Sequence, residues 1–142
     1  MVLFARDVAE KVFLSLPRQT NALEAARMMK ENHQGFAIVS DGAAPEGIVT
    51  EWDYLSKIIA EGKDPAAVRL VDIMTPGLIT VKGSDGLESV AKTMTERGVR
   101  RVLVMQDDRI LGVITSRTIL ARLEEYVNRI STTIARLQAP PY

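Results

Sequence analysis

An internal repeat constrains the fold of this chain more than any other feature of its sequence. Aligned with itself at an offset of 65 residues, the chain keeps its register without gaps from Asp7 to Leu55. The identical residues that meet in this alignment include Asp7 with Asp72, Ala26 with Ala91, Met29 with Met94, Glu31 with Glu96, Val39 with Val104, Gly47 with Gly112, Thr50 with Thr115 and Leu55 with Leu120. A chain of 142 residues therefore has room for two similar units within one body.

Each copy of the repeat predicts the order strand, helix, strand, strand, helix. A short apolar segment opens each copy, and a helix with apolar residues at i, i+3, i+4 and i+7 follows, with Asn21 and Asp85 as expected N-caps. Two continuously apolar runs come next, which is typical of strands covered on both faces. A second helix is predicted after Thr50 and after Thr115. The fold class is therefore α/β (α+β), a tandem pair of βαββα repeats.

The last helix is predicted to be longer than its counterpart in the first copy. Residues 1–64 form the first repeat, 65–125 the second, and 126–142 a C-terminal helix extension and tail. The apolar positions of this helix step by 3, 4, 3, 4 and 3 residues, and they are Leu120, Leu123, Val127, Ile130, Ile134 and Leu137. This spacing forms a narrow seam of the coiled-coil kind, which we expect to pack on another subunit. The alternative is that the helix folds back over its own core.

Composition excludes several classes of function. Eighteen basic residues balance eighteen acidic ones, so no nucleic-acid partner is expected. The chain has no cysteine, and His33 is its single histidine, so no metal site is expected. No apolar run approaches the roughly 20 residues of a membrane span, and we expect a cytoplasmic protein without a membrane partner. Motifs of P-loop, serine-elbow and zinc-peptidase type are absent, which predicts a protein that is not an enzyme.

Two motifs give the repeat a family resemblance. The segment from Gly47 to Asp53 reads Gly-Ile-Val-Thr-Glu-Trp-Asp, and the segment from Val71 to Pro76 reads Val-Asp-Ile-Met-Thr-Pro. They resemble the nucleotide-contacting segment and the opening segment of the CBS (cystathionine β-synthase) domain pair, and the resemblance covers nearly the whole chain. It implies a flat module with pseudo-two-fold symmetry, two clefts between the repeats that often hold AMP, ADP, ATP or related adenosyl compounds, and frequent assembly into a homodimer.

One nucleotide site can be built from both repeats. Asp53, in the first turn of a helix, is predicted to accept the ribose hydroxyl protons, and Thr50 at the N-cap of that helix offers a hydroxyl and backbone N–H groups to an anion. The alternative is that this pair only closes a capping box. The resemblance implies basic residues that face the phosphates from the opposite repeat, where Arg101 and, after it, Arg100 are the candidates. The alternative is that the two arginines are a solvated surface pair.

Base recognition is predicted around the first two strands of copy one. The candidates are Leu14, Ser15, Gly35, Phe36, Ala37 and Ile38. A second, weaker cleft is expected, because Thr118 stands at the position of Asp53, and Gly35 and Phe36 stand at the positions of the two arginines. The residues left to contact a ligand there are Thr115, Thr118 and Arg117.

Three functions follow from this sequence. The leading hypothesis is a regulatory module that needs no cofactor, binds AMP, ADP or ATP between the repeats, and signals by conformational change to a separate effector protein. One alternative is a ligand-free scaffold for oligomerisation, in which Thr50 and Asp53 merely cap a helix. Another is a module that binds S-adenosylmethionine or a related adenosyl compound.

Overall fold

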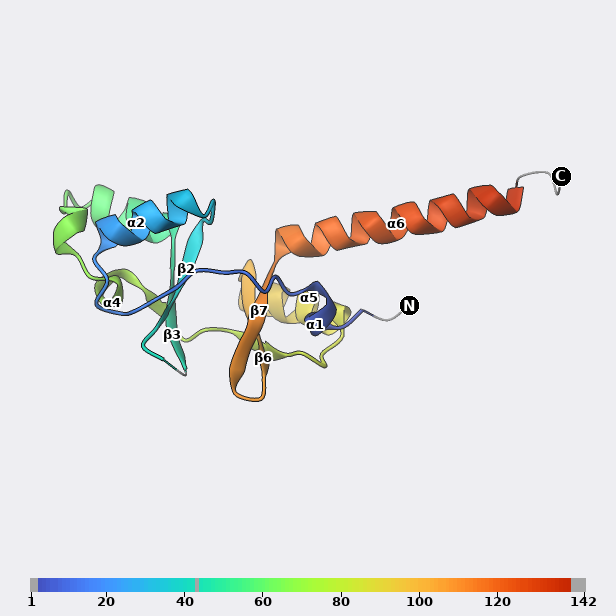
Figure 1. Ribbon diagram of the computed structural model, residues 1–142, viewed down its shortest axis with the longest axis horizontal. Coiled ribbons are helices and arrows are strands. Elements are labelled where there is room, and N and C mark those ends of the chain that lie inside the picture. Colours follow the sequence, from blue (N-terminus) through green and yellow to red (C-terminus); the bar gives the residue numbers. More distant parts are fainter. Residues whose placement is uncertain (1–2, 43, 139–142) are drawn as a thin grey trace.

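The computed structural model describes residues 3–42 and 44–138, which form two lobes side by side and a long helix that leaves the second lobe (Figure 1). The elements of the first lobe are β1 (Ser15–Leu16), α2 (Ala22–Glu31), β2 (Phe36–Ser40), β3 (Pro45–Thr50), α3 (Glu51–Tyr54) and the π-helix η1 (Leu55–Ile59) that continues it. Those of the second lobe are β5 (Thr80–Lys82), α5 (Leu87–Arg97), β6 (Arg101–Gln106), β7 (Arg109–Thr115) and α6 (Ser116–Gln138). The predicted fold class and the βαββα order of both copies are confirmed.

The two sheets share topology and register. The first has the order β1-β2-β3-β4, where β4 (Thr75–Pro76) adds a short edge, and the second has the order β5-β6-β7. In each sheet the first strand runs parallel to the second and the second antiparallel to the third. Both sheets shift register at the same place, between Val39 and Ser40 in one and between Val104 and Met105 in the other. The pseudo-two-fold symmetry therefore extends to a single bulge in each hairpin.

The repeats exchange their opening helices. Helix α4 (Leu70–Ile73), preceded by the 3₁₀ turn η2 (Pro65–Ala67), packs into the core of the first lobe, whereas α1 (Ala5–Val8) packs into the core of the second. The N–H of Leu70 donates to the carbonyl of Thr20 at 3.0 Å. At the equivalent place the N–H of Ala5 donates to the carbonyl of Asp85 at 2.8 Å. Each lobe thus contains chain from both repeats, so the division at residues 64 and 65 describes the sequence and not the lobes.

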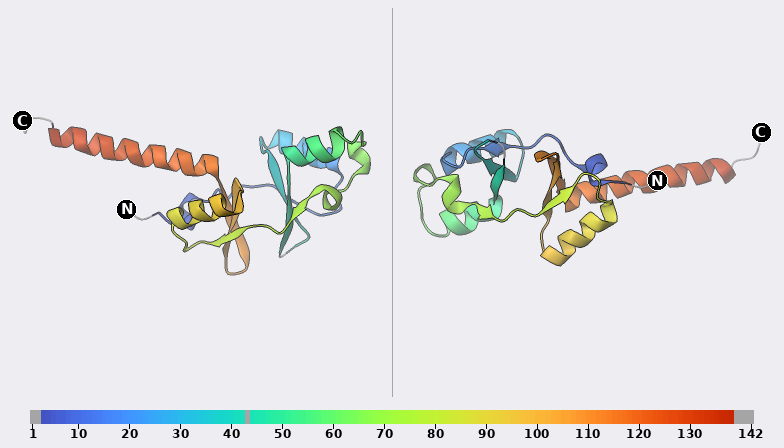
Figure 2. Two further views of the ribbon diagram at one scale, coloured as in Figure 1. Left: turned by 180° about the vertical axis from the view of Figure 1, so that it is seen from behind. Right: turned by 90° about the horizontal axis from the view of Figure 1, so that it is seen from below.

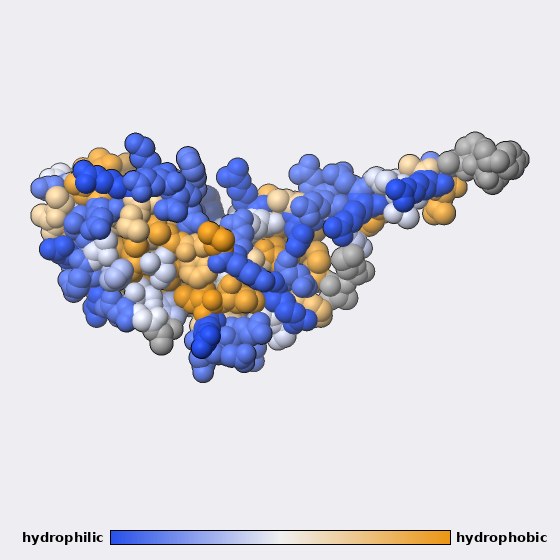
Figure 3. Space-filling view, viewed as in Figure 1, coloured by the Kyte–Doolittle hydropathy of each residue, from blue (hydrophilic) through white to orange (hydrophobic). Residues whose placement is uncertain are grey.

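A third apolar cluster joins the lobes. Its buried members are Phe36, Ile38, Leu103 and Val113. Ile38 and Leu103 are equivalent at the 65-residue offset, so the pseudo-two-fold axis passes through this cluster. In the space-filling view, apolar side chains gather in the middle of the molecule, where the lobes meet (Figure 3). The sheets therefore face each other across a shared core, and a ligand between them contacts both repeats.

The helix ends follow the sequence in part. Asn21 caps α2 as predicted, because its Oδ1 accepts the N–H of Glu24 at 2.8 Å. Asp85 does not cap α5 directly. Gly86 is the N-cap, and the Asp85 carboxylate instead accepts the N–H of Lys82 at 2.8 Å in the preceding turn.

Helix α6 projects beyond the body of the molecule (Figures 1 and 2). It touches β7 and α1 near its start, and none of its residues is buried. The long helix is confirmed, and it does not fold back over its own core. Among the described residues, no helix is both long enough and apolar enough to cross a membrane.

Candidate functional site

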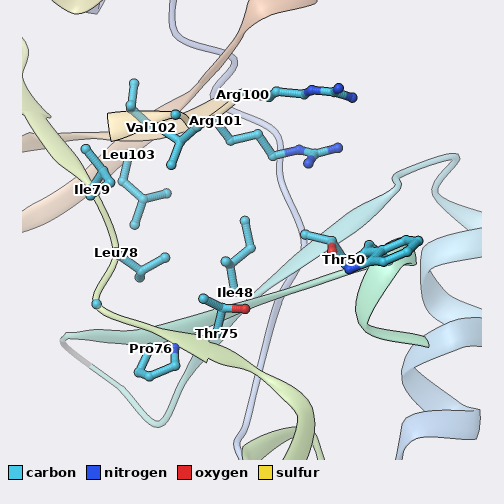
Figure 4. A pocket seen from close by; sticks show the side chains of 14 residues that line it. Ile48, Thr50, Thr75, Pro76, Leu78, Ile79, Arg100, Arg101, Val102 and Leu103 are labelled. Carbon is cyan, nitrogen blue, oxygen red and sulfur yellow. The ribbon is translucent and has the colours of Figure 1, made fainter. Parts of the chain in front are cut away.

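A cleft of about 530 Å³ lies between the lobes, a volume typical of small-molecule sites (Figure 4). The first lobe and the chain that leaves it contribute Ile48, Thr50, Trp52, Thr75, Pro76 and Gly77. The second repeat contributes Leu78, Ile79, Gly98, Val99, Arg100, Arg101, Val102 and Leu103. The cleft is therefore where the sequence predicts a ligand, between the two copies.

One part of the cleft is apolar. Figure 4 shows Ile48 from β3 opposite Leu78, Ile79 and Leu103 of the second lobe. Leu103 belongs to the apolar cluster that joins the lobes, Ile48 and Leu78 pack against that cluster, and Ile79 packs against the core of the second lobe. A flat, apolar ring fits between such walls.

The other part of the cleft is cationic. In Figure 4 the side chains of Arg100 and Arg101 run side by side toward the edge where Thr50 lies. The half-buried Arg101 guanidinium lies 5.1 Å from the centre of the Phe36 ring, and its Nε has no hydrogen-bond acceptor among the described residues. Burial lowers the pKa of Arg101, Glu51 opposes that change, and Arg100 adds to it. An anion in the cleft would satisfy the free donor and offset the repulsion between the two arginines.

The Asp53 carboxylate faces its own helix. It is 4% exposed, and its Oδ2 accepts the Thr50 N–H at 2.8 Å and the Thr50 hydroxyl at 3.2 Å. Its Oδ1 pairs with Lys57 Nζ at 2.9 Å, and the same ammonium donates to the Ile73 carbonyl at 2.8 Å. The structure therefore brings Thr50, Arg100 and Arg101 together at the cleft, whereas Asp53 lies behind Thr50 in a capping arrangement. Its contact with a ribose stays a prediction.

The sequence profile of the CBS domain matches residues 5–60 and 70–125, the two copies of the repeat. The chain belongs to the CBS domain family. It is 34% identical over 124 residues to an uncharacterized protein from Methanopyrus kandleri, an alignment that covers 85% of this chain and 62% of that protein. CBS pairs are regulatory ligand-binding modules, and most are not enzymes.

Two solved structures place this CBS pair among its relatives. A hexameric CBS-CP12 protein from bloom-forming cyanobacteria is 31% identical, with a TM-score of 0.77 over 84% of this chain and 67% of that one. The CBS domain pair of the protein MJ0100, solved with 5′-methylthioadenosine and S-adenosyl-L-methionine, is 23% identical, with a TM-score of 0.77 over 89% of this chain and 99% of that one. Members of the family thus bind adenosyl ligands and form oligomers.

The symmetry-related place between the two CBS repeats is filled differently. The Gln34 side chain accepts the Leu14 N–H at 2.8 Å and donates to the Val12 carbonyl at 3.2 Å. Gln34 therefore holds the backbone of the segment before β1. Its equivalent in the cleft is Val99, whose side chain has no hydrogen-bonding group.

The polar residues predicted for the second cleft make a cap without a charge. The Thr118 hydroxyl accepts the Thr115 N–H at 2.9 Å and donates to the Thr115 carbonyl at 2.8 Å, while Arg117 is exposed. The carboxylate end of the exposed Glu51 packs against Gly35, so a side chain at this position, as at the equivalent Arg100, would have to displace it. This place therefore has neither the paired arginines nor the open backbone of the cleft.

None of the residues predicted to recognise the base lines the cleft. Phe36 and Ile38 lie in the cluster between the lobes, Ala37 in the core of the first lobe, and Leu14 beside Gln34. Ser15 is exposed on β1, and Gly35 lies beside Glu51. The residues that the sequence reasoning missed are Ile48, Trp52, Thr75, Pro76, Gly77, Leu78, Ile79, Gly98, Val99, Val102 and Leu103. The repeat carried a signal for several of them, because adding 65 to positions 14 and 35–38 leads to Ile79 and to residues 100–103.

Proposed function

We propose that this CBS pair is a regulatory module that binds an adenine nucleotide, AMP, ADP or ATP, in the cleft between its repeats. The observation that carries the proposal is the two-part cleft, in which an apolar slot built by both lobes continues into a pair of arginines. Adenine needs a flat apolar slot, and a phosphate needs donors that carry positive charge. Both requirements are met in one cleft, where Ile48 and Leu78 supply apolar walls and the arginine pair supplies the charge.

In this arrangement the base lies between Ile48 and Leu78, and the phosphates lie at Arg101 and Arg100. A phosphate is a better partner for the buried Nε of Arg101 than the Phe36 ring, because a guanidinium can hold a phosphate in a bidentate way. Thr50 lies on the cleft wall, and its hydroxyl meets the ligand once it releases Asp53 Oδ2. Asp53 reaches the ribose once its Oδ1 exchanges Lys57 for the sugar hydroxyls.

Charge supports a nucleotide over S-adenosylmethionine. The two arginines repel the positive sulfonium of S-adenosylmethionine, whereas they attract the negative phosphates of ATP. The adenosyl ligands in the MJ0100 structure favour an adenosyl compound as the second candidate. A third candidate is a scaffold without a ligand, favoured by the closed capping arrangement of Asp53.

The proposal makes the module a sensor and not a catalyst. The described side chains that line the cleft include no carboxylate and no imidazole, the usual general bases. The ligand acts by favouring one orientation of the lobes, which share the cluster around Ile38 and Leu103. A separate effector protein reads that orientation, in the cytoplasm, where adenine nucleotides are available.

Isothermal titration calorimetry with ATP, AMP, adenosine and S-adenosylmethionine tests the proposal. We expect affinity to fall in the order ATP, AMP, adenosine, because each step removes negative charge from the arginine pair. Thermal unfolding gives an independent readout, since a ligand at 100 times its Kd adds about 2.7 kcal/mol to the free energy of unfolding. Tighter binding of S-adenosylmethionine than of any nucleotide would favour the second candidate. No binding of any of the four would leave the scaffold.

A further inference from the structure

We infer that α6 pairs with α6 of a second copy of this chain, in an antiparallel coiled coil that places Val127 of one helix against Ile130 of the other. This inference concerns a surface remote from the cleft and does not depend on what the cleft binds.

The first observation is an unpartnered apolar stripe along α6. Its members are Leu120, Leu123, Val127, Ile130, Ile134 and Leu137. Their exposed fractions run from 42% at Ile130 to 80% at Leu137. In the first repeat the equivalent of Leu123 is Ile58, which is 2% exposed in the core of its lobe. The first repeat therefore buries this position in its own lobe, whereas the second repeat leaves it exposed on α6.

The second observation is that the stripe is complementary to itself. When two α6 helices run antiparallel about a two-fold axis between residues 128 and 129, all of its positions are paired. Leu120 then meets Leu137 of the second copy, Leu123 meets Ile134, and Val127 meets Ile130. In heptad terms the stripe alternates a and d positions, and each layer pairs an a position of one helix with a d position of the other, as in knobs-into-holes packing.

Charge along the flanks of the stripe favours a second copy over a charged partner. The flanking positions, one residue before or after the stripe, are Ile119, Tyr126 and Thr133 on one side and Glu124, Ser131 and Gln138 on the other. Only Glu124 among them is charged, and in the antiparallel register it lies beside Ser131 of the second copy. The arginines of α6 at 122, 129 and 136 lie off the seam, and the antiparallel helix dipoles attract each other.

The mass in solution tests the pairing. Analytical ultracentrifugation of the whole chain and of Ile130→Lys is expected to show that the variant has half the mass of the parent. A lysine in the seam would bury its charge against apolar side chains, which costs free energy of association. Thr132→Lys places the same charge on the outer face of α6 and is expected to keep the parent mass. A monomeric parent, or an Ile130→Lys variant with the parent mass, would refute the inference. Far-UV circular dichroism monitors the fold of each variant.

Cross-linking tests the register, because the chain contains no cysteine of its own. A mixture of the Leu120→Cys and Leu137→Cys chains is expected to form a mixed disulfide on mild oxidation, and neither chain alone should form a disulfide dimer. In an antiparallel pair the two Leu120 positions lie 17 residues apart along the seam, about 25 Å at 1.5 Å per residue, which no disulfide spans. Disulfide dimers of Leu120→Cys alone would indicate parallel helices and overturn the proposed register.

Discussion

In the cleft, the chain before β5 passes beside Val99 and two arginines, whereas at the symmetry-related place the chain before β1 is held by the Gln34 side chain. The strands around the two places keep the same register and the same bulge. The difference therefore lies in a few side chains, and one of them, Phe36 at the position equivalent to Arg101, belongs to the shared core. The two copies keep one fold, and under the proposed function the change at these positions suits one of the two places to an anionic ligand.

The largest expected effect is on stability, and it comes from a substitution in one of the exchanged helices. Leu70 of α4 is fully buried in the first lobe, while its equivalent Ala5 fills less space in the second. Leu70→Ala is expected to lower the free energy of unfolding by about 2–5 kcal/mol, because it leaves a cavity in a closed core. Denaturant unfolding measures the change, and Leu55→Ala, at a 49% exposed position of η1 outside the α6 stripe, is the matched control. A loss below about 1 kcal/mol would show that the first lobe does not depend on α4.

Removing Arg101 is expected to have the next largest effect. A charge-assisted hydrogen bond contributes about 1.5–3 kcal/mol, so Arg101→Ala should weaken ATP binding by roughly 10- to 150-fold. Adenosine, which has no phosphate, should lose little. Arg97→Ala, at the exposed end of α5, is the control for the loss of one positive charge. An equal loss of affinity for ATP and adenosine in calorimetry would place Arg101 away from the phosphates.

Val99→Gln gives the cleft the side chain that stands at the symmetry-related position 34. In Val99→Gln the new amide is expected to bond the backbone of Gly77 and Ile79, as Gln34 bonds Val12 and Leu14. If the edge of the base bonds this same backbone, the loss of two backbone hydrogen bonds corresponds to about 1–3 kcal/mol. ATP and adenosine should therefore lose affinity equally, in contrast to Arg101→Ala.

Val99→Leu, which adds bulk without hydrogen-bonding groups, separates the loss of space from the loss of backbone partners. If Val99→Gln binds ATP as tightly as the parent while its fold is intact, the backbone before β5 plays no part in recognition.

Much of the fold was accessible from the sequence because local patterns determine it. Apolar periodicity gave both βαββα copies, and the unbroken pattern after Ser116 gave α6. The exchange of α1 and α4 was not accessible, since a four-residue helix can pack on either lobe with the same local sequence. The motif resemblance, with its implication that a ligand lies between the two copies, was what led to Thr50, Arg100 and Arg101.

The site was harder to predict where one residue type serves two purposes. In the sequence Gln34 looks like an ordinary loop residue. Only the folded backbone shows that its side-chain amide bonds both Val12 and Leu14. Asp53 presents the same difficulty, because a carboxylate three residues after Thr50 suits both a capping box and a ribose contact. Spacing along the chain does not separate the two roles.

Asp53→Thr gives the first repeat the cap of the second and has the smallest expected effect. The free energy of unfolding should fall by about 1 kcal/mol or less. A threonine can make the cap, as the Thr118 hydroxyl does by accepting the Thr115 N–H, and the ion pair that is lost involves Lys57, whose side chain is 42% exposed. Affinity for ATP and adenosine should fall together, by about 1–2 kcal/mol, because the ribose loses a charged acceptor but Lys57 no longer needs to be displaced.

Asp72→Thr is the matched control for this last change, because Asp72 accepts the Arg69 N–H at 3.4 Å in an equivalent cap of α4, outside the cleft. Calorimetry gives the affinities and denaturant unfolding gives the stability of both variants. Unchanged affinity in Asp53→Thr, with the same small loss of stability as in Asp72→Thr, would mean that the carboxylate only caps its helix. The difference between the two places would then lie entirely in the arginine pair and in Val99.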